Sequence, residues 1–365
     1  PIMSYVSKLT NVLSNDLPGW HKARLKFMAR FVGSLLKLST VNLSKLAPAL
    51  KPDVQVSSNY RRIQRFMAGF AFDFDAFGQL LLRLLPQKTG FVVSMDRTNW
   101  QFGDTQINVL MIGICRGRTC FPVVWRLLGK AGNSNTEERI ALMRRFLALV
   151  DAEDVRAFVA DREFIGEKWL GYLKSEKVPF FIRIRKNTNV GASKTAAHRL
   201  FSSLEVGQKR VVPGGKKKVL GQQLHVVGLK YIGREGEPEH LLLVCPERPR
   251  RALCHYRRRW GIETLFAALK SRGFDLEATH LTNETRLEKL LGLLALAFAW
   301  SRLVGEWRDQ RNPIKIKKHG RREKSLFRYG LDHLRKIMLN LADQQEQFLV
   351  CLQALVAPRK FLSCT

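Results

Sequence analysis

The stretch from residue 255 to residue 281 carries side chains whose types and spacing could support chemistry on a phosphate. At about 100° per residue, a helix here brings four polar or ionisable side chains within about 60° of one another. They are Tyr256, Arg259, Glu263 and Lys270, and Gly273 is the predicted stop of the helix. Two interpretations are open. The four form a solvated charged face in which Arg259 pairs with Glu263, or the carboxylate holds a divalent metal while its neighbours contact phosphate oxygens.

Two aspartates at the ends of predicted strands could complete such a site. Asp96 ends a strand predicted for residues 90–96, and Asp161 directly follows one predicted for 155–160. Further strands are predicted at 106–115, 120–128 and 179–185, and helices at 135–150 (with Thr136 as candidate cap), 163–177 and 287–304, with a final helix pair over about 331–356. A lone aspartate at a strand end is usually a turn or cap residue. The order β-β-β-α-β-α-β is, however, that of an RNase H-like fold, in which strands one and four are adjacent and the two carboxylates converge.

Asp96, Asp161 and Glu263 are hard oxygen donors from three separate elements. Mg²⁺ prefers carboxylates together with water and substrate phosphates. Two such ions about 4 Å apart can activate the attacking oxygen and stabilise the leaving oxygen in phosphoryl transfer. We therefore predict that these three residues are both the catalytic residues and the metal ligands.

The charge of the chain points to a polyanionic partner. Lysine and arginine total 62 against 31 acidic residues, which gives a net charge of +31 and a pI near 10.4. Nucleic acid is the first candidate, since a membrane-surface protein would concentrate its charge on an amphipathic helix. Hydrophobic residues make up 45% of the chain, enough to form a core.

The cysteines and the apolar segments favour a cytoplasmic protein without membrane spans. None of the six cysteines forms a CxxC pair, so we predict reduced thiols rather than a zinc site or a disulfide framework. The start of the chain has no apolar core typical of a signal peptide. The apolar run at residues 290–300 is too short to cross a bilayer.

The predicted fold is α/β: an RNase H-like mixed sheet with a β-rich insertion, flanked by an N-terminal helical domain and C-terminal helices. Its predicted parts are residues 1–88 (helical, DNA-binding), 89–187 (first part of the catalytic core), 188–249 (basic β-rich insertion), 250–305 (second part of the core) and 306–365 (basic segment and helices).

Two basic regions outside the core are candidate DNA contacts. A short helix over residues 42–50 precedes a basic helix that starts at Ser57, which is the order of a helix-turn-helix unit, although many small helical domains share it. Its candidate contacts are Arg61, Arg62 and Arg65. The segment 308–328, with Arg321 and Arg322, is either an arm along the DNA backbone or a disordered basic linker.

These residues resemble a known family, the bacterial DDE transposases of the insertion-sequence-four family. Tyr256-x2-Arg259-x3-Glu263-x6-Lys270 fits its YREK signature at every spacing. Asp161-Arg162-Glu163-Phe164 looks like its second-aspartate motif, and Asp96 occupies the first-aspartate position. The resemblance covers about residues 57–335, and the distance from residue 161 to residue 263 can hold the family's β insertion.

The resemblance implies an enzyme that binds the terminal inverted repeats of an insertion sequence, cuts at the element ends and joins the 3′-hydroxyls to target DNA. It implies two divalent ions, Mg²⁺ with Mn²⁺ able to substitute, and a homodimer that pairs two double-stranded ends in the cytoplasm, at the nucleoid. Arg162 and the YREK side chains other than Glu263 are then expected to contact DNA. A cut-and-paste route through a hairpin intermediate is also expected.

Trp260 matches a family position near a flipped base, and the alternative is that it packs in the core. Some relatives place a stacking tryptophan in the β insertion, whereas residues 170–259 contain none here; Tyr231 or a phenylalanine could substitute. Two other functions stay open. One is an RNase H-like nuclease that cuts without strand joining, and the other is a catalytically inactive DNA-binding regulator derived from a transposase.

Overall fold

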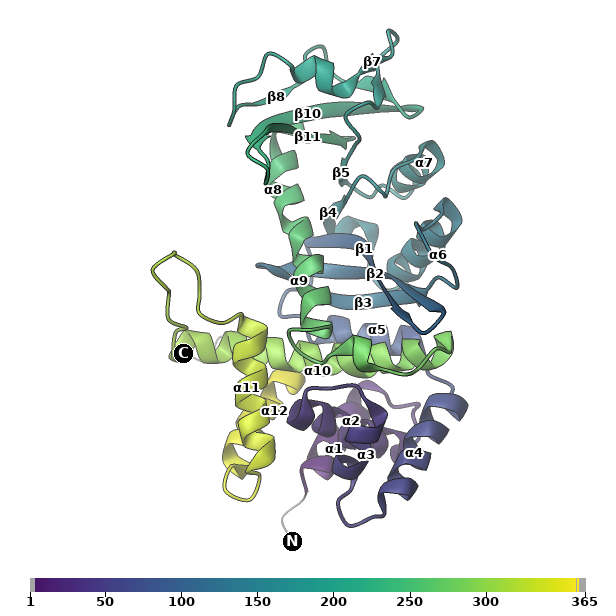
Figure 1. The fold of residues 1–365 in the computed structure, drawn as a ribbon, viewed down its shortest axis with the longest axis vertical. Coiled ribbons are helices and arrows are strands. Elements are labelled where there is room, and N and C mark those ends of the chain that lie inside the picture. Colours follow the sequence, from purple (N-terminus) through teal and green to yellow (C-terminus); the bar gives the residue numbers. More distant parts are fainter. Residues whose placement is uncertain (1–3, 359, 361–365) are drawn as a thin grey trace.

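The computed structural model describes residues 4–358 and residue 360. Helices from both ends of the chain gather at one end of an elongated molecule, the large sheet lies in the middle, and short strands form the other end (Figure 1). The N-terminal helices are α1 (Tyr5–Asp16), α2 (Lys22–Leu38), α3 (Leu43–Leu50), α4 (Val56–Gly69) and α5 (Phe74–Arg83). The predicted helical character of this region is confirmed.

The α3–α4 pair has the predicted order of a short helix, a turn and a basic helix. The Asn42 side chain caps α3 by accepting the backbone N–H groups of Ser44 and Lys45. Asn59 is buried and donates to the Lys51 carbonyl at 2.8 Å, which ties the turn to α4. Helix α4 begins at Val56 without a side-chain cap, so the prediction that serines cap it from residue 57 is wrong.

The centre of the fold is the predicted mixed sheet, with the strand order β3-β2-β1-β4-β5. Its strands are β1 (Phe91–Phe102), β2 (Thr105–Arg116), β3 (Thr119–Leu127), β4 (Val155–Ala160) and β5 (Phe180–Arg183). The first three are antiparallel to one another, whereas β4 is parallel to both β1 and β5. Strands one and four are adjacent, as an RNase H-like fold requires.

Strand β1 is longer than predicted. The prediction ended it at Asp96, but its pairing with β2 continues to Phe102 and Thr105 at the hairpin turn. On the other edge of β1, the parallel ladder with β4 ends at the pair Ser94–Val159. Asp96 therefore lies in the part of β1 that is paired with β2 but no longer with β4.

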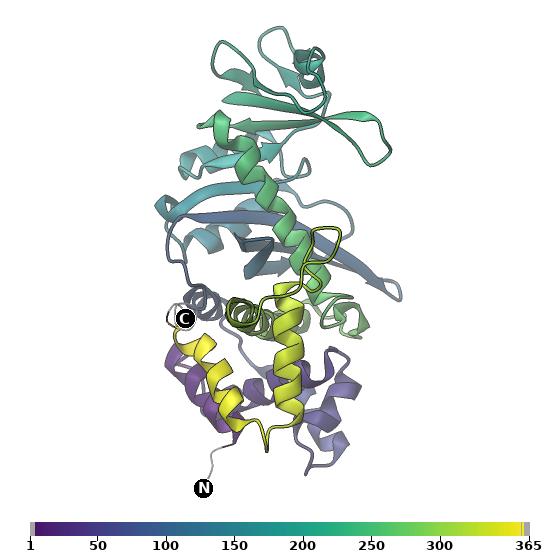
Figure 2. The same ribbon diagram turned by 90° about the vertical axis from the view of Figure 1, so that its left-hand side faces the viewer.

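Helices cover the sheet. They are α6 (Thr136–Leu147), α7 (Glu167–Ser175), α8 (Ala252–Tyr256) and α9 (Trp260–Leu269). Helix α6 packs on β2 and β3, and α7 packs against α6. Helices α8 and α9, joined by a 3₁₀ turn at Arg257–Arg259, run as one rod from β11 across β4 and β5 to β3 (Figure 2).

Three predicted helix boundaries are wrong. The α8–α9 rod stops at Leu269 rather than at Gly273, because the N–H groups of Arg272 and Phe274 turn back onto the carbonyls of the last turn. Helix α7 begins at Glu167 instead of residue 163, which leaves residues 161–166 as a loop. The cap of α6 is Asn135, in a reciprocal capping box with Glu138, and not Thr136.

The insertion is rich in short strands, and it extends the central sheet. Its elements are β6 (Asn189–Val190), β7 (Thr195–Ala196), β8 (Lys209–Val211), β9 (Lys217–Val219), β10 (Gln222–Ile232) and β11 (Pro238–Cys245). Strand β11 pairs with β5 in the antiparallel sense, and β10 pairs with β11. The insertion thus continues the same sheet past its parallel part (Figure 1).

Three helices close the core: α10 (Glu284–Arg311), α11 (Leu326–Leu339) and α12 (Gln345–Val356). Helix α10 lies between the sheet and the N-terminal helices and is buried from Leu287 to Gly305 over most of its circumference (Figure 1). Within residues 4–358 and 360, no helix is long and apolar enough to cross a membrane. The segment between α10 and α11 forms a loop closed by a β-bridge between Ile316 and Arg322.

The prediction that the cysteines are reduced is wrong for one pair. Cys115 and Cys120 lie opposite each other on β2 and β3 and form a disulfide. Their alignment across a tight hairpin, which spacing alone does not reveal, brings the two sulfurs together. Cys245, Cys254 and Cys351 are free thiols, and Cys364 lies outside the described residues.

Candidate active site

The two predicted aspartates occupy equivalent register positions, one on β1 and the other directly after the parallel strand β4. Asp96 lies on β1 two residues beyond Ser94, and Asp161 lies two residues beyond Val159, which is paired with Ser94. Each carboxylate accepts the N–H of the next residue through Oδ1, from Arg97 and from Arg162, both at 2.8 Å. The two side chains are therefore presented at the same edge of the β1–β4 pair.

Arg259 joins the first aspartate to the predicted glutamate. Its Nη2 lies 2.6 Å from Oε1 of Glu263, and its Nη1 lies 3.6 Å from Oδ2 of Asp96. The arginine side chain is only 11% exposed, and its Nε, among the described residues, has no hydrogen-bond partner. A buried guanidinium thus stands between two carboxylates from different elements.

Asp161 is held by two other residues. The hydroxyl of Tyr256 donates to Oδ1 of Asp161 at 3.3 Å, and Nη1 of Arg183, on β5, lies 3.8 Å from the same atom. Burial raises the pKa of Tyr256, so its phenol stays a neutral donor. Arg183 was not among the predicted site residues; its place at the end of the strand next to β4 is the signal that could have found it.

The carboxylates influence one another through space. The pKa of Asp96 is raised from 3.8 to about 6. Burial is the largest cause, the charges of Glu263 and Asp161 contribute to the rise, and the Arg97 N–H and Arg259 oppose it. The three predicted acids therefore share one electrostatic environment.

The carboxylate oxygens of Asp96, Asp161 and Glu263 are of a kind that binds divalent metal ions. They do not, however, converge on a single point in this structure. In the described part of the chain, no three His, Cys, Asp or Glu side chains gather closely enough to hold an ion. The Arg259 guanidinium lies between Asp96 and Glu263, where a metal ion bound by both carboxylates would have to lie. Carboxylates that gather around a cation are the ligand type that Mg²⁺ prefers.

Lys270 and Trp260 lie at the ends of α9. The Lys270 ammonium donates to the Asn99 carbonyl on β1 at 3.0 Å and pairs with Glu277 at 2.8 Å, so its contacts are farther along β1 than Asp96. Trp260 is 52% exposed, which excludes the alternative that it packs in the core. Its ring lies beside Arg259, whose guanidinium carbon is 5.9 Å from the ring centroid.

The structure places the other predicted DNA contacts on the surface, and among them only Arg162 is adjacent in sequence to one of the predicted acids, Asp161. Arg61, Arg62 and Arg65 are exposed on α4, and Arg162 is exposed in the loop after β4. Arg321 and Arg322 are exposed in the loop between α10 and α11, where Arg322 pairs with Asp309 at 2.8 Å. That loop has hydrogen bonds of its own, such as the one from the Lys317 N–H to the Arg321 carbonyl at 2.9 Å, and its role as an arm along the DNA backbone stays a prediction.

A basic groove adds residues that the sequence analysis missed. It lies between α2 and α4, has a volume of about 650 Å³, and is lined by Ala23, Arg24, Phe27, Arg30, Lys51, Arg62, Arg65 and Phe66. Five of these are cations and none is acidic. Arg24 and Arg30 can be recognised in the sequence as cations of a helical segment, but their approach to α4 depends on tertiary packing.

Comparison with known proteins accounts for this arrangement. No curated protein matches the chain. The family model of the transposase DDE domain matches residues 88–300, a range that holds the central sheet, the insertion, Asp96, Asp161 and Glu263. The match covers more than half of the chain, and the mixed sheet has the RNase H-like strand order on which the prediction rested. The chain therefore belongs to the DDE-domain transposases, enzymes that cleave DNA during transposition.

Proposed function

We propose that this transposase is of the insertion-sequence-four type, with Tyr256, Arg259, Glu263 and Lys270 as its YREK signature. It would bind the terminal inverted repeats of its element, cut at the element ends and join the 3′-hydroxyls to target DNA. The observation that carries the proposal is the approach of Asp96 and Glu263 to one buried guanidinium, with Asp161 beside them under Tyr256.

Asp96, Asp161 and Glu263 would hold the divalent ions, Mg²⁺ or Mn²⁺ in its place. When bound, such ions polarise the scissile phosphate and lower the pKa of the attacking water or hydroxyl. Arg259 would be free to leave its two carboxylates if a metal ion took its place as their cationic partner. Its guanidinium, with an unused Nε and the phenol of Tyr256 nearby, can then donate to phosphate oxygens.

The basic surface would hold the DNA while the carboxylates act. Arg62 and Arg65 of α4 line the basic groove between α2 and α4. Arg162 lies one residue from Asp161, and the net charge of the chain is +31. Backbone contacts of this kind give affinity without sequence information. Two copies of the chain would pair the two ends, because each catalytic site serves one end.

The test is incubation of the protein with Mg²⁺ and DNA that carries the ends of its own element, followed by sequencing of the products. Asp96→Asn, Asp161→Asn and Glu263→Gln should each abolish cleavage and leave end binding largely intact. Asp104→Asn, in the exposed turn between β1 and β2, is the matched control and should cut normally.

The products separate the alternatives. Joined 3′ ends support a transposase with strand transfer, cut ends that are never joined support a nuclease, and binding without any cut supports a regulator. A carboxylate variant that still nicks at more than trace rates would remove that residue from the proposed site.

A further inference from the structure

The distance between the two aspartates is not fixed by the sheet itself. The β1–β4 ladder ends at Ser94–Val159, so no ladder hydrogen bond joins Asp96 to Asp161 or any residue beyond them. Asp161 also begins a loop, residues 161–166, that is without regular structure until α7 starts. Another contact must hold the loop against β1 where the carboxylates converge.

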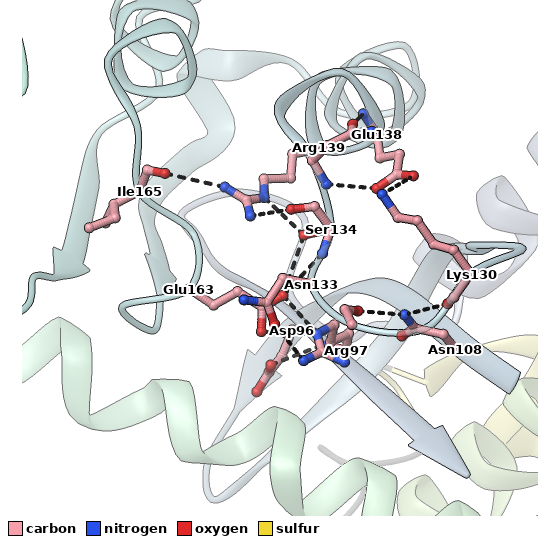
Figure 3. A network of polar contacts seen from close by, with 12 residues as sticks. Asp96, Arg97, Asn108, Lys130, Asn133, Ser134, Glu138, Arg139, Glu163 and Ile165 are labelled. Carbon is pink, nitrogen blue, oxygen red and sulfur yellow. Dashed lines mark hydrogen bonds and ion pairs between the residues drawn. The ribbon is translucent and has the colours of Figure 1, made fainter. Parts of the chain in front are cut away.

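That contact is the ion pair between Arg97 and Glu163, which lie just after Asp96 and Asp161 in the sequence. Nε of Arg97 donates to both carboxylate oxygens of Glu163, at 2.7 and 2.9 Å, and Nη2 donates to Oδ1 of Asn133 at 2.8 Å (Figure 3). Each side chain of the pair is 18% exposed. Arg97 is the neighbour of Asp96, and Glu163 is two residues from Asp161. The pair therefore links the two segments that carry the aspartates.

The far side of the pair is anchored to the start of α6. The N–H of Ser134 donates to Oε1 of Glu163 at 3.3 Å. Buried Arg139 donates to Oγ of Ser134 at 2.9 Å and to the Ile165 carbonyl at 3.3 Å (Figure 3). It also lies over the ring of buried Phe164. The loop after β4 is thus held from α6 as well as from β1.

Arg97 contacts none of the three acids with its side chain. Successive side chains of a strand point to opposite faces, so Asp96 faces Arg259 while Arg97 faces Asn133 and Glu163. We propose that Arg97 and Glu163 are positioning residues, which set the separation of the Asp96 and Asp161 carboxylates and thereby the affinity of the site for divalent metal. This inference rests on the proposed function, because it takes the aspartates as metal ligands.

The experiment measures Mn²⁺ binding to the DNA-free full chain by electron paramagnetic resonance titration, together with thermal melting in EDTA. Glu163→Gln keeps the size of the side chain but loses the charge of the pair. It should weaken Mn²⁺ binding about tenfold, the lower end of the range for residues that orient metal ligands. The Mg²⁺ concentration for half-maximal nicking should rise by a similar factor, and the rate at saturating Mg²⁺ should largely recover.

The matched control is Glu306→Gln. Glu306 pairs with Arg116 at 3.1 Å and joins β2 to α10, far in sequence from either aspartate. It should lower the melting temperature and leave Mn²⁺ affinity unchanged. If Glu163→Gln does not fold, Arg97→Lys keeps the charge but not the bidentate geometry and should weaken Mn²⁺ binding by a smaller factor.

Each outcome has a distinct meaning. Unchanged Mn²⁺ affinity in Glu163→Gln or Arg97→Lys, alongside a lower melting temperature, overturns the positioning role and leaves the proposed function intact. Failure of the wild-type chain to bind Mn²⁺, or equal binding by wild type and Asp96→Asn, overturns the metal site of the proposed function and the positioning role with it. Weaker binding in the Glu163 variant but not in the Glu306 variant supports the inference.

Discussion

Without bound metal, the proposed active site should lower the stability of the protein at neutral pH. The effect can be measured at Asp96. Its pKa is raised from 3.8 to about 6, chiefly by burial, with the charges of Glu263 and Asp161 contributing and the Arg97 N–H and Arg259 opposing the rise. The folded state therefore binds the Asp96 proton more tightly than the unfolded state does. Its contribution to stability is present below about pH 4, falls as the pH rises to about 6, and remains lost above that.

The size of the effect follows from the shift. A difference of about 2 pKa units corresponds to about 3 kcal/mol, which is an upper limit. Asp96→Asn removes the charge and keeps an oxygen that can accept the Arg97 N–H. It also weakens the contact with Arg259, which still has Glu263 as partner at 2.6 Å. We expect Asp96→Asn to be about 1–3 kcal/mol more stable than the wild type at pH 8 and unchanged at pH 4.

The assay is urea unfolding in EDTA at pH 4, 5, 6 and 8, which compares each variant with the wild type at the same pH. Asp104→Asn is the control, since its side chain is exposed, and its stability difference should not vary in this way. Mg²⁺ should then stabilise the wild type more than Asp96→Asn. Two results would refute the reasoning. One is an Asp96→Asn protein that is no more stable than the wild type at pH 8, and the other is a stability gain over the wild type that is as large at pH 4 as at pH 8.

Three further predictions concern packing and DNA contact. Gly330→Ala should destabilise the protein by about 1–3 kcal/mol in urea unfolding, because a Cβ there would clash with the Ser301 carbonyl where α11 crosses α10. Gly69→Ala, at the open end of α4, should leave stability unchanged or raise it by up to about 1 kcal/mol. Trp260→Ala should leave stability and first-strand nicking nearly intact but impair hairpin formation, seen on a denaturing gel of end-labelled DNA; the absence of any hairpin with the wild type would contradict that route. The logarithm of the DNA-binding constant should fall by about 0.9 per log unit of salt concentration for each phosphate that the protein neutralises. Arg62→Ala should make this slope shallower by the contribution of about one phosphate contact.

The sheet could be predicted because its strands are apolar and bounded by turn residues. Strand β4 matches its prediction of residues 155–160, since it lies between two other strands and is buried on both faces from Ala157 to Ala160. Strand β1 was cut short because the segment from Arg97 to Phe102 is mostly polar and pairs only with β2. Local sequence shows that such a segment is polar, and only the hairpin shows that it is a strand.

The loop after β4 escaped prediction for a different reason. Residues 163–177 are compatible with one helix, but the segment from Asp161 to Gly166 is held away from helical geometry by contacts that are distant in sequence. Phe164 is buried in the core, and Glu163 pairs with Arg97. Neither constraint leaves a periodic signal in the chain, although the two residues stand in the motif that suggested the site.

Arg259 brings together the two interpretations of the helix from which the sequence analysis began. Helical periodicity placed it on one face with Glu263, and the predicted ion pair is present at 2.6 Å. The face is not solvated, because β1 brings Asp96 to the same guanidinium and leaves the arginine 11% exposed. Helical periodicity predicts which side chains share a face. It does not predict how deeply that face is buried, because burial depends on which other elements pack against the helix. The ion pair and the proposed metal site are therefore compatible, since two carboxylates that share one buried cation are already arranged to share another.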